Sequence, residues 1–163
     1  NDAEHAWHMA LMTVLLSEYS NEPIDVLKTV TMLLIHDLVE IDAGDTYAYS
    51  GVPKEEQHAK EEKGAARIFG MLPKEKGAKL YALWQEFEAG ETAEARFAHA
   101  MDNIQPMMLN DYTDGKAWQQ FGVSLSKIYK RNELMPKGSR VLWKYAKEKI
   151  LAPNVEKGRI RDE

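Results

Sequence analysis

The sequence predicts an all-α protein, folded as a single bundle of about six or seven helices over residues 1–163. Three observations support this fold class. Apolar residues recur at helical spacing along most of the chain, whereas no stretch alternates with a period of two for long enough to indicate a sheet. Proline and glycine separate the periodic segments. A length of 163 residues usually corresponds to one domain, and 44% hydrophobic with 29% charged residues is ordinary for a globular protein.

The first two helices are predicted at residues 3–19 and at about 24–41. Asp2 is the expected N-cap of the first helix, and the segment "SNEP" separates it from the second. The second helix carries the apolar run "TVTMLLI", which leads directly into His36 and Asp37. It is followed by "DAGDTYAYSGVP", whose composition indicates a loop.

The rest of the chain is expected to hold five further helices. They are predicted to start near Pro53, near Pro73 and at Glu91, and then to span about 117–132 and 136–151. Gly90 suits the end of the fourth helix, and Pro106 predicts a bend in the fifth. The polar tail, residues 152–163, is expected to fray.

Composition excludes several classes of protein and site. The chain has no cysteine, so it has no disulfide, no cysteine zinc site and no thiol nucleophile, which fits a reducing, cytoplasmic location. No apolar run approaches the roughly 20 residues of a membrane span, and "NDAEHAWHMALM" does not resemble a signal peptide. A net charge of −5 argues against a nucleic-acid polymer held through its phosphates. It does not argue against a small anionic substrate beside a bound metal.

The stretch "LLIHDLVEIDAGDT" places one imidazole and four carboxylates at the end of a predicted core helix. Burial of such groups is costly unless they are paired or bind a metal. In an α-helix His36 and Glu40 lie one turn apart, so Glu40 is expected to face the same space as His36 and Asp37 without being a necessary ligand. Asp42 shares its loop with Asp45 and fits a turn-forming role.

Two more side chains complete a plausible ligand set. His5 lies on an apolar helix, and Asp102 falls in the middle of "ARFAHAMDNI", where aspartate is a poor helix former and would avoid a buried stripe if it were unpaired. Two histidines and two aspartates suit several divalent metals, among them manganese, cobalt, iron, zinc and magnesium.

Other interpretations stay open at this stage. The pair His36–Asp37 could be an ion pair at a helix end, and His5 could be a satisfied surface histidine. His8, three residues after His5, could replace it as a ligand or line the site as a substrate contact. Tyr47, in the loop after Asp45, is a further candidate for a substrate contact.

Two histidines outside this set raise the question of a second metal. His58 lies in "EEQHAKEEK", which is typical of a solvated helix face, and His99 precedes Asp102 by three residues. A binuclear centre that used His58 and His99 would favour phosphodiesterase chemistry.

Three segments in order, "AEHAWHMALM", "LLIHDLVEIDAGD" and "EARFAHAMD", resemble the motifs of the HD-domain metal-dependent phosphohydrolases. The resemblance runs from about residue 3 to 112 and is strongest to the 5′-deoxynucleotidase branch. It implies that one divalent metal ion is held by four ligands, and that two further carboxylates act as catalytic acids. The implied ligands are His5, His36, Asp37 and Asp102, and the implied acids are Glu40 and Asp45. The family's upstream helix, which supplies a basic residue to the phosphate pocket, is expected to be missing from this chain.

The resemblance further implies a metal-dependent phosphomonoesterase that acts on small nucleotides, in particular deoxynucleoside 5′-monophosphates, and that forms a homodimer. Two alternatives are an HD-type phosphodiesterase or nucleotide pyrophosphohydrolase, and a non-catalytic module that binds a nucleotide for regulation. Degenerate regulatory members usually lose metal ligands, whereas all four ligand positions are filled here.

Overall fold

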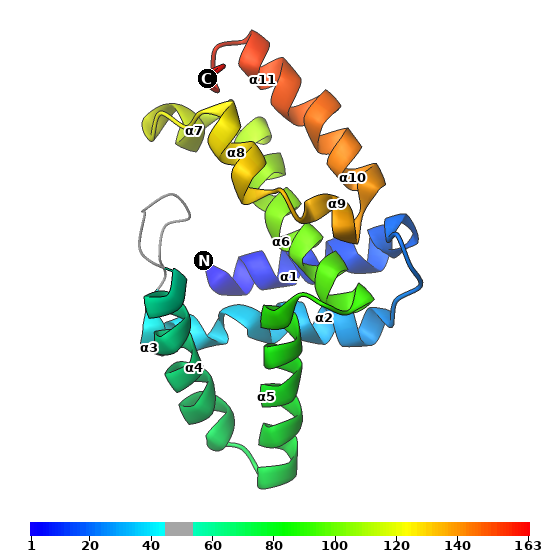
Figure 1. The fold of residues 1–163 in the computed structure, drawn as a ribbon, viewed down its shortest axis with the longest axis vertical. Helices are drawn as coiled ribbons and strands as arrows, with labels where there is room; N and C mark the ends of the chain where they lie inside the picture. The colour runs from blue at the N-terminus through cyan, green and yellow to red at the C-terminus, as the bar shows by residue number, and fades with distance from the viewer. Residues whose placement is uncertain (45–53) are drawn as a thin grey trace.

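A computed structural model describes residues 1–44 and 54–163 of the chain, and helix dominates these residues (Figure 1). The described part contains no β-strand, only an isolated bridge between Ser124 and Arg161. The all-α prediction is confirmed. No helix in this part of the chain combines the length and the apolar character that crossing a lipid bilayer requires.

The helices are more numerous than the six or seven expected, because the C-terminal third is divided into short pieces. They are α1 (Asp2–Leu16), α2 (Val26–Ile35), α3 (Glu40–Ala43), α4 (Lys54–Gly70), α5 (Lys74–Ala89), α6 (Ala93–Tyr112), α7 (Lys116–Gln120), α8 (Leu125–Arg131), α9 (Met135–Gly138), α10 (Arg140–Tyr145) and α11 (Ala152–Glu156). A π-helical turn, Ala146–Leu151, joins α10 to α11.

The N-terminal helices differ from prediction at two points that matter for the site. The N-cap of α1 is Asn1, whose side chain accepts a hydrogen bond from the backbone N–H of Glu4, so Asp2 lies inside the first turn. The second predicted helix is not continuous. It ends at Ile35, and a 3₁₀ turn, His36–Val39, separates α2 from α3. His36 and Asp37 therefore lie on this tighter turn.

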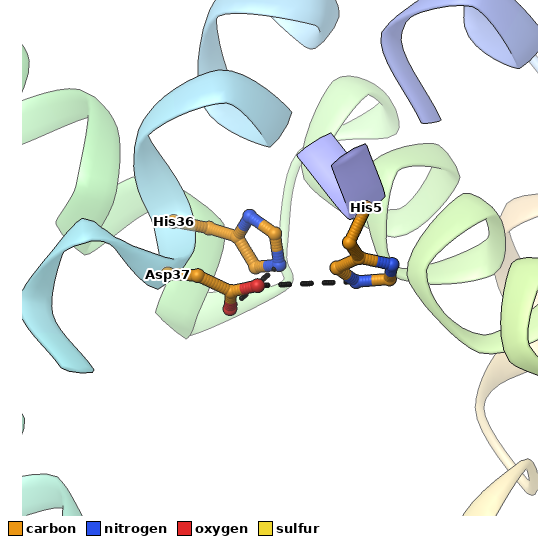
Figure 2. Close-up of side chains that lie close together, drawn as sticks. All are labelled: His5, His36 and Asp37. Carbon is orange, nitrogen blue, oxygen red and sulfur yellow. Dashed lines mark ion pairs between the residues drawn. The ribbon is translucent and has the colours of Figure 1, made fainter. Parts of the chain in front are cut away.

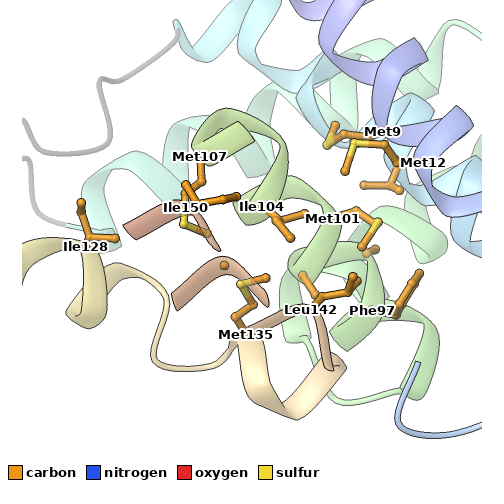
Figure 3. Packing of buried hydrophobic residues seen from close by; sticks show 14 of the residues in the cluster. Met9, Met12, Phe97, Met101, Ile104, Met107, Ile128, Met135, Leu142 and Ile150 are labelled. Carbon is orange, nitrogen blue, oxygen red and sulfur yellow. The ribbon is translucent and has the colours of Figure 1, made fainter. Parts of the chain in front are cut away.

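Helix α6 is the centre of the molecule, with α1 and α2 beside it and α9 and α10 covering another side (Figure 1). It continues through Pro106 to Tyr112. Its buried side chains include Phe97, Met101 and Ile104, which pack in the main hydrophobic core against residues of α1 and of the C-terminal helices (Figure 3). Burial of several large apolar side chains along one helix stabilises its position, so a polar residue on α6 is held firmly in place.

The α4–α5 hairpin has a smaller core of its own, made with the 3₁₀ turn. Val39, Phe69 and Trp84 are buried in this second cluster. Gly64 of α4 lies so close to the turn that an added Cβ would sit 2.7 Å from the carbonyl oxygen of Val39. Only glycine permits this approach, which brings the hairpin against this turn.

The C-terminal tail does not fray as expected. Asn154 and Ile160 are buried, and Asn154 Nδ2 donates to a carboxylate oxygen of Asp111 over 2.7 Å. The backbone N–H of Arg161 donates to the carbonyl of Val123 over 3.2 Å, and the carbonyl of Arg161 accepts from the N–H of Leu125. Buried side chains and backbone hydrogen bonds to α8 therefore hold this segment, although its composition is polar.

Candidate metal centre

Three helical segments bring two histidines and two aspartates together. His5 lies near the start of α1, His36 and Asp37 lie on the 3₁₀ turn, and Asp102 lies midway along α6. His36 Nε2 is 2.9 Å from Asp37 Oδ1, and His5 Nε2 is 3.8 Å from Asp37 Oδ2 (Figure 2). Asp102 Oδ1 is 3.2 Å from His5 Nε2 and 3.7 Å from His36 Nε2. The four residues thus form one compact group, although 97 residues separate its most distant members along the chain.

Both histidines present the same nitrogen to the carboxylates. The Nδ1–H of His36 donates to the carbonyl of Leu33 over 2.9 Å, within the last turn of α2. The Nδ1–H of His5 donates to Gln105 Oε1 over 3.0 Å. Because each Nδ1 is engaged in this way, each Nε2 is left to face Asp37 and Asp102. Such outer hydrogen bonds determine the tautomer and ring orientation of metal-binding histidines.

Gln105 is a part of the site that the sequence interpretation missed. Its side chain is buried, and it accepts from His5 while its Nε2 donates to His8 Nδ1 over 3.0 Å. It follows Asp102 by three residues, so both project from neighbouring positions on one face of α6. The sequence did contain a sign of this role, because Gln105 is a polar residue on the buried face of α6 that also carries Met101 and Ile104.

The electrostatics of the group reflect this pairing. Burial alone would lower the pKa of His36, but hydrogen bonds to Asp102 and Asp37 outweigh it and raise the pKa to about 10. The pKa of Asp102 is lowered well below its usual range, because the two imidazoles outweigh the burial that would raise it. The pKa of His5 is raised, since Asp102 and Asp37 outweigh its desolvation. In the absence of a metal ion, these shifts favour protonated imidazoles beside the half-buried carboxylates.

The donor set fits a divalent metal ion. One ligand atom from each of His5, His36 and Asp37 lies within 4.8 Å of the others, and Asp102 borders both histidines. Imidazole nitrogen and carboxylate oxygen together suit manganese, cobalt, iron or zinc. A metal cation could replace the imidazole protons at the same nitrogen atoms, so its binding would release protons.

The position of Glu40 differs from the one assumed in the helical argument. Glu40 begins α3, after the 3₁₀ turn that carries His36. A 3₁₀ turn has about three residues per turn, so the α-helical offset between positions i and i+4 does not apply here. The spacing argument for Glu40 is therefore wrong, and its role as a catalytic acid stays a prediction. Asp45 and Tyr47 lie outside the residues that the structure describes.

The other candidate histidines and Asp42 have identifiable partners. His8 contacts Gln105, but it does not belong to the set of His5, His36 and Asp37 whose ligand atoms lie close together. The structure therefore places it beside the centre. The Nε2–H of His99 donates to the carbonyl of Phe87 over 2.7 Å, and its ring stacks on that of Phe87. His58 faces Glu88 of α5 instead of His99. Asp42 forms an ion pair with Arg67 of α4.

Comparison with known proteins agrees with this geometry. The family model described as "HD domain" matches residues 1–143, which include all four residues of the centre. The chain belongs to the HD domain family. Its HD motif is His36–Asp37, on the 3₁₀ turn.

The chain is similar both to curated proteins and to a protein of solved structure. The chain is 30% identical to the human 5′-deoxynucleotidase HDDC2 over 113 residues, which cover 69% of this chain and 54% of that protein. It is 31% identical to the Dictyostelium discoideum 5′-deoxynucleotidase HDDC2 over 115 residues, which cover 68% and 60%. The chain thus spans little more than half the length of these curated relatives.

A solved structure resembles the chain over almost its whole length. It is described as a predicted metal-dependent phosphohydrolase from Magnetospirillum magnetotacticum MS-1, with 44% identity and a TM-score of 0.91. The match covers 99% of this chain and 80% of that protein. At this identity and coverage, the resemblance extends beyond the fold to the sequence as a whole.

Proposed function

We propose that this chain is a metal-dependent phosphomonoesterase that hydrolyses small nucleotides, in particular deoxynucleoside 5′-monophosphates. The observation that carries the proposal is the convergence of His5, His36, Asp37 and Asp102, with both Nε2 atoms turned toward the carboxylates. The 5′-deoxynucleotidase names of the relatives support the choice of substrate class. The name of the solved structure supports the metal dependence.

The four residues of the centre would hold one divalent ion. When bound, such an ion stabilises negative charge on a phosphate oxygen and makes a water molecule more acidic. The chain's own contribution is to hold the ligands in place through Leu33 and Gln105, and to keep the centre partly shielded from bulk water. In this proposal Glu40 orients the attacking water and accepts its proton. Asp45 protonates the departing sugar oxygen or holds the water.

A screen that follows both inorganic phosphate and the nucleotide products tests the proposal. Deoxynucleoside and ribonucleoside 5′-monophosphates, 3′-monophosphates, cyclic nucleotides and nucleoside triphosphates would each be assayed with manganese, cobalt, magnesium and zinc. We expect metal-dependent release from deoxynucleoside 5′-monophosphates, abolished in Asp37→Ala. Preferential cleavage of a cyclic nucleotide or a triphosphate would instead establish a phosphodiesterase or a pyrophosphohydrolase. Nucleotide binding without turnover under any metal would establish the regulatory alternative.

Homodimer formation is a further part of the proposal. Helix α1 exposes four apolar side chains whose spacing places them along one face of the helix. They are Trp7, Leu11, Val14 and Leu15. Contiguous apolar surface of this kind is typical of an interaction site. Light scattering after size exclusion should give the mass of a dimer, and Leu11→Glu should shift it toward a monomer. A monomeric mass for the unaltered chain would contradict this part.

A further inference from the structure

A second group of metal-ligating side chains lies between α4 and α5, outside the centre described above. His58 and Glu61 lie three residues apart on α4 and therefore share a face of the helix, and Glu88 faces them from α5. One ligand atom from each of the three lies within 4.8 Å of the others. His58 Nδ1 is 3.5 Å from Glu88 Oε2. The sequence indicated a solvated face around His58 and raised it as a second-metal ligand only together with His99, because the approach of α5 is not visible in the local pattern.

Neighbouring side chains restrict two members of this group. The ring of His58 stacks on the buried indole of Trp84, with centroids 6.1 Å apart and planes at 11°. Gln57 Nε2 donates to Glu61 Oε1 over 2.9 Å. A residue restrained by stacking or by a hydrogen bond loses less conformational entropy when it binds a ligand.

The charge of the group is poorly balanced by the protein. Among side chains that the structure describes, no lysine or arginine forms an ion pair with Glu61 or Glu88. Burial and the neighbouring carboxylate of Glu61 raise the pKa of Glu88, and the imidazole of His58 offsets this only in part. Two carboxylates that have only the imidazole of His58 as a basic partner are stabilised by a cation placed between them.

The space beside the group can hold a hydrated ion. A cavity of about 260 Å³ is lined by His58, Trp84 and Glu88, together with Glu62, Gln85 and Ala89. A water molecule occupies about 30 Å³ in the liquid, so the cavity has room for an ion with several waters. The buried side chain of Trp84 forms one wall of this cavity, and its indole Nε1 has no hydrogen-bond acceptor among the described residues.

We propose that His58, Glu61 and Glu88 bind a second divalent cation, of the class that accepts one imidazole and two carboxylates, such as Mn²⁺. This site is distinct from the centre at His36, although the two are near each other. Glu88 directly follows Phe87, whose ring centroid lies 5.0 Å from that of His36. The binding does not depend on the proposed hydrolase activity.

Counting bound Mn²⁺ on the metal-stripped full chain tests the proposal. Free Mn²⁺ gives a strong electron paramagnetic resonance signal that is lost on binding, so a titration yields the number of ions per chain. We expect Glu88→Gln and His58→Gln each to bind about one ion fewer than the unaltered chain. Glu56→Gln, on α4 beyond the group and paired with Lys60, removes the same charge and should leave the count unchanged.

Two further measurements keep the outcomes separate. Asp102→Asn should weaken the first centre, so the ion that this variant still binds should be the one at the second site. The double variant, Asp102→Asn with Glu88→Gln, should lose that ion. Far-UV circular dichroism and thermal unfolding show whether each variant is folded, and His58→Gln, at an exposed position, is the conservative variant. Equal Mn²⁺ counts for the unaltered chain and folded Glu88→Gln would overturn the second site. So would loss of all binding in folded Asp102→Asn. Failure of the phosphatase proposal would instead appear as no phosphate release, with the Mn²⁺ count unaffected.

Discussion

The two histidine–carboxylate groups of this chain share their chemistry and differ in how they are held. The group at His36 draws on α1, the 3₁₀ turn and α6, and of its two histidines His36 is buried and His5 is half-buried. The group at His58 draws only on α4 and α5, and its histidine is exposed. Imidazole and carboxylate groups thus come together once in the interior of the bundle and once near the surface of a hairpin.

The difference shows that a metal site requires neighbouring residues that orient its ligands. In the first group, Leu33 and Gln105 engage both Nδ1 atoms, so the coordinating nitrogens are already oriented. In the second, Gln57 orients one carboxylate, but His58 is restrained mainly by stacking on Trp84. We therefore expect tight metal binding at the first group and weaker, more exchangeable binding at the second.

The largest expected effect is that of Asp37→Ala. Removal of this carboxylate deletes a ligand and leaves His36 without its closest partner, 2.9 Å away. Tight metal binding and phosphate release should be lost together, and excess metal should restore only part of the activity. Elemental analysis and phosphate release on the same samples provide the measurement. Glu88→Gln is the matched comparison, because it should retain the tightly bound ion. Retention of that ion in Asp37→Ala would remove the residue from the ligand set.

Glu40→Ala should separate metal binding from turnover. If Glu40 acts on the water rather than on the metal, the variant keeps its ion while single-turnover phosphate release falls by about 10²- to 10⁴-fold. Metal content and turnover, measured on one preparation, distinguish the possibilities. An ion lost together with the activity would make Glu40 a ligand, and unchanged turnover would end its assignment as a catalytic acid.

Gln105→Leu should weaken metal binding without deleting a ligand. The substitution removes the acceptor of His5 Nδ1–H, and changes at such outer partners typically reduce metal affinity by about 10- to 100-fold. Competition with a fluorescent chelator measures the change. Gln57→Leu, at the other group, should leave the affinity of the first centre unaltered. An unchanged affinity in Gln105→Leu would show that packing alone orients His5.

The smallest expected effect is a pH dependence of stability in the metal-free protein. The folded pKa of His36, about 10, lies above its ordinary value of 6.5. Its contribution to stability is therefore fully present below pH 6.5 and is lost as the pH rises toward 10. The melting temperature of the metal-free protein should fall over this interval. Bound metal displaces the proton, so the metal-loaded protein should show less of this fall, as should His36→Asn. An equal fall in His36→Asn would assign the effect to other groups.

The sequence by itself predicted the fold class, and it singled out the four residues that the structure brings together at the first centre. Apolar residues at helical spacing predict helices because only that period places them on one buried face. His5 and Asp102 stood out because a titratable residue on an apolar helix is costly unless it has a partner. These are local signals, and a linear sequence displays them directly.

Only the tertiary structure decided how the groups are completed. The chain forms a 3₁₀ turn at His36, where α4 approaches closely at Gly64. This turn changes the direction of Glu40 relative to His36 and Asp37 from the one expected in an α-helix. Gln105 meets His5 across 100 residues, and Glu88 meets His58 across the α4–α5 hairpin. The polar tail is ordered because Ile160 is buried against the rest of the bundle. Each of these contacts joins segments that are remote or separately helical in the sequence. These contacts contribute to stability only when the helices pack together, so a local sequence pattern does not predict them.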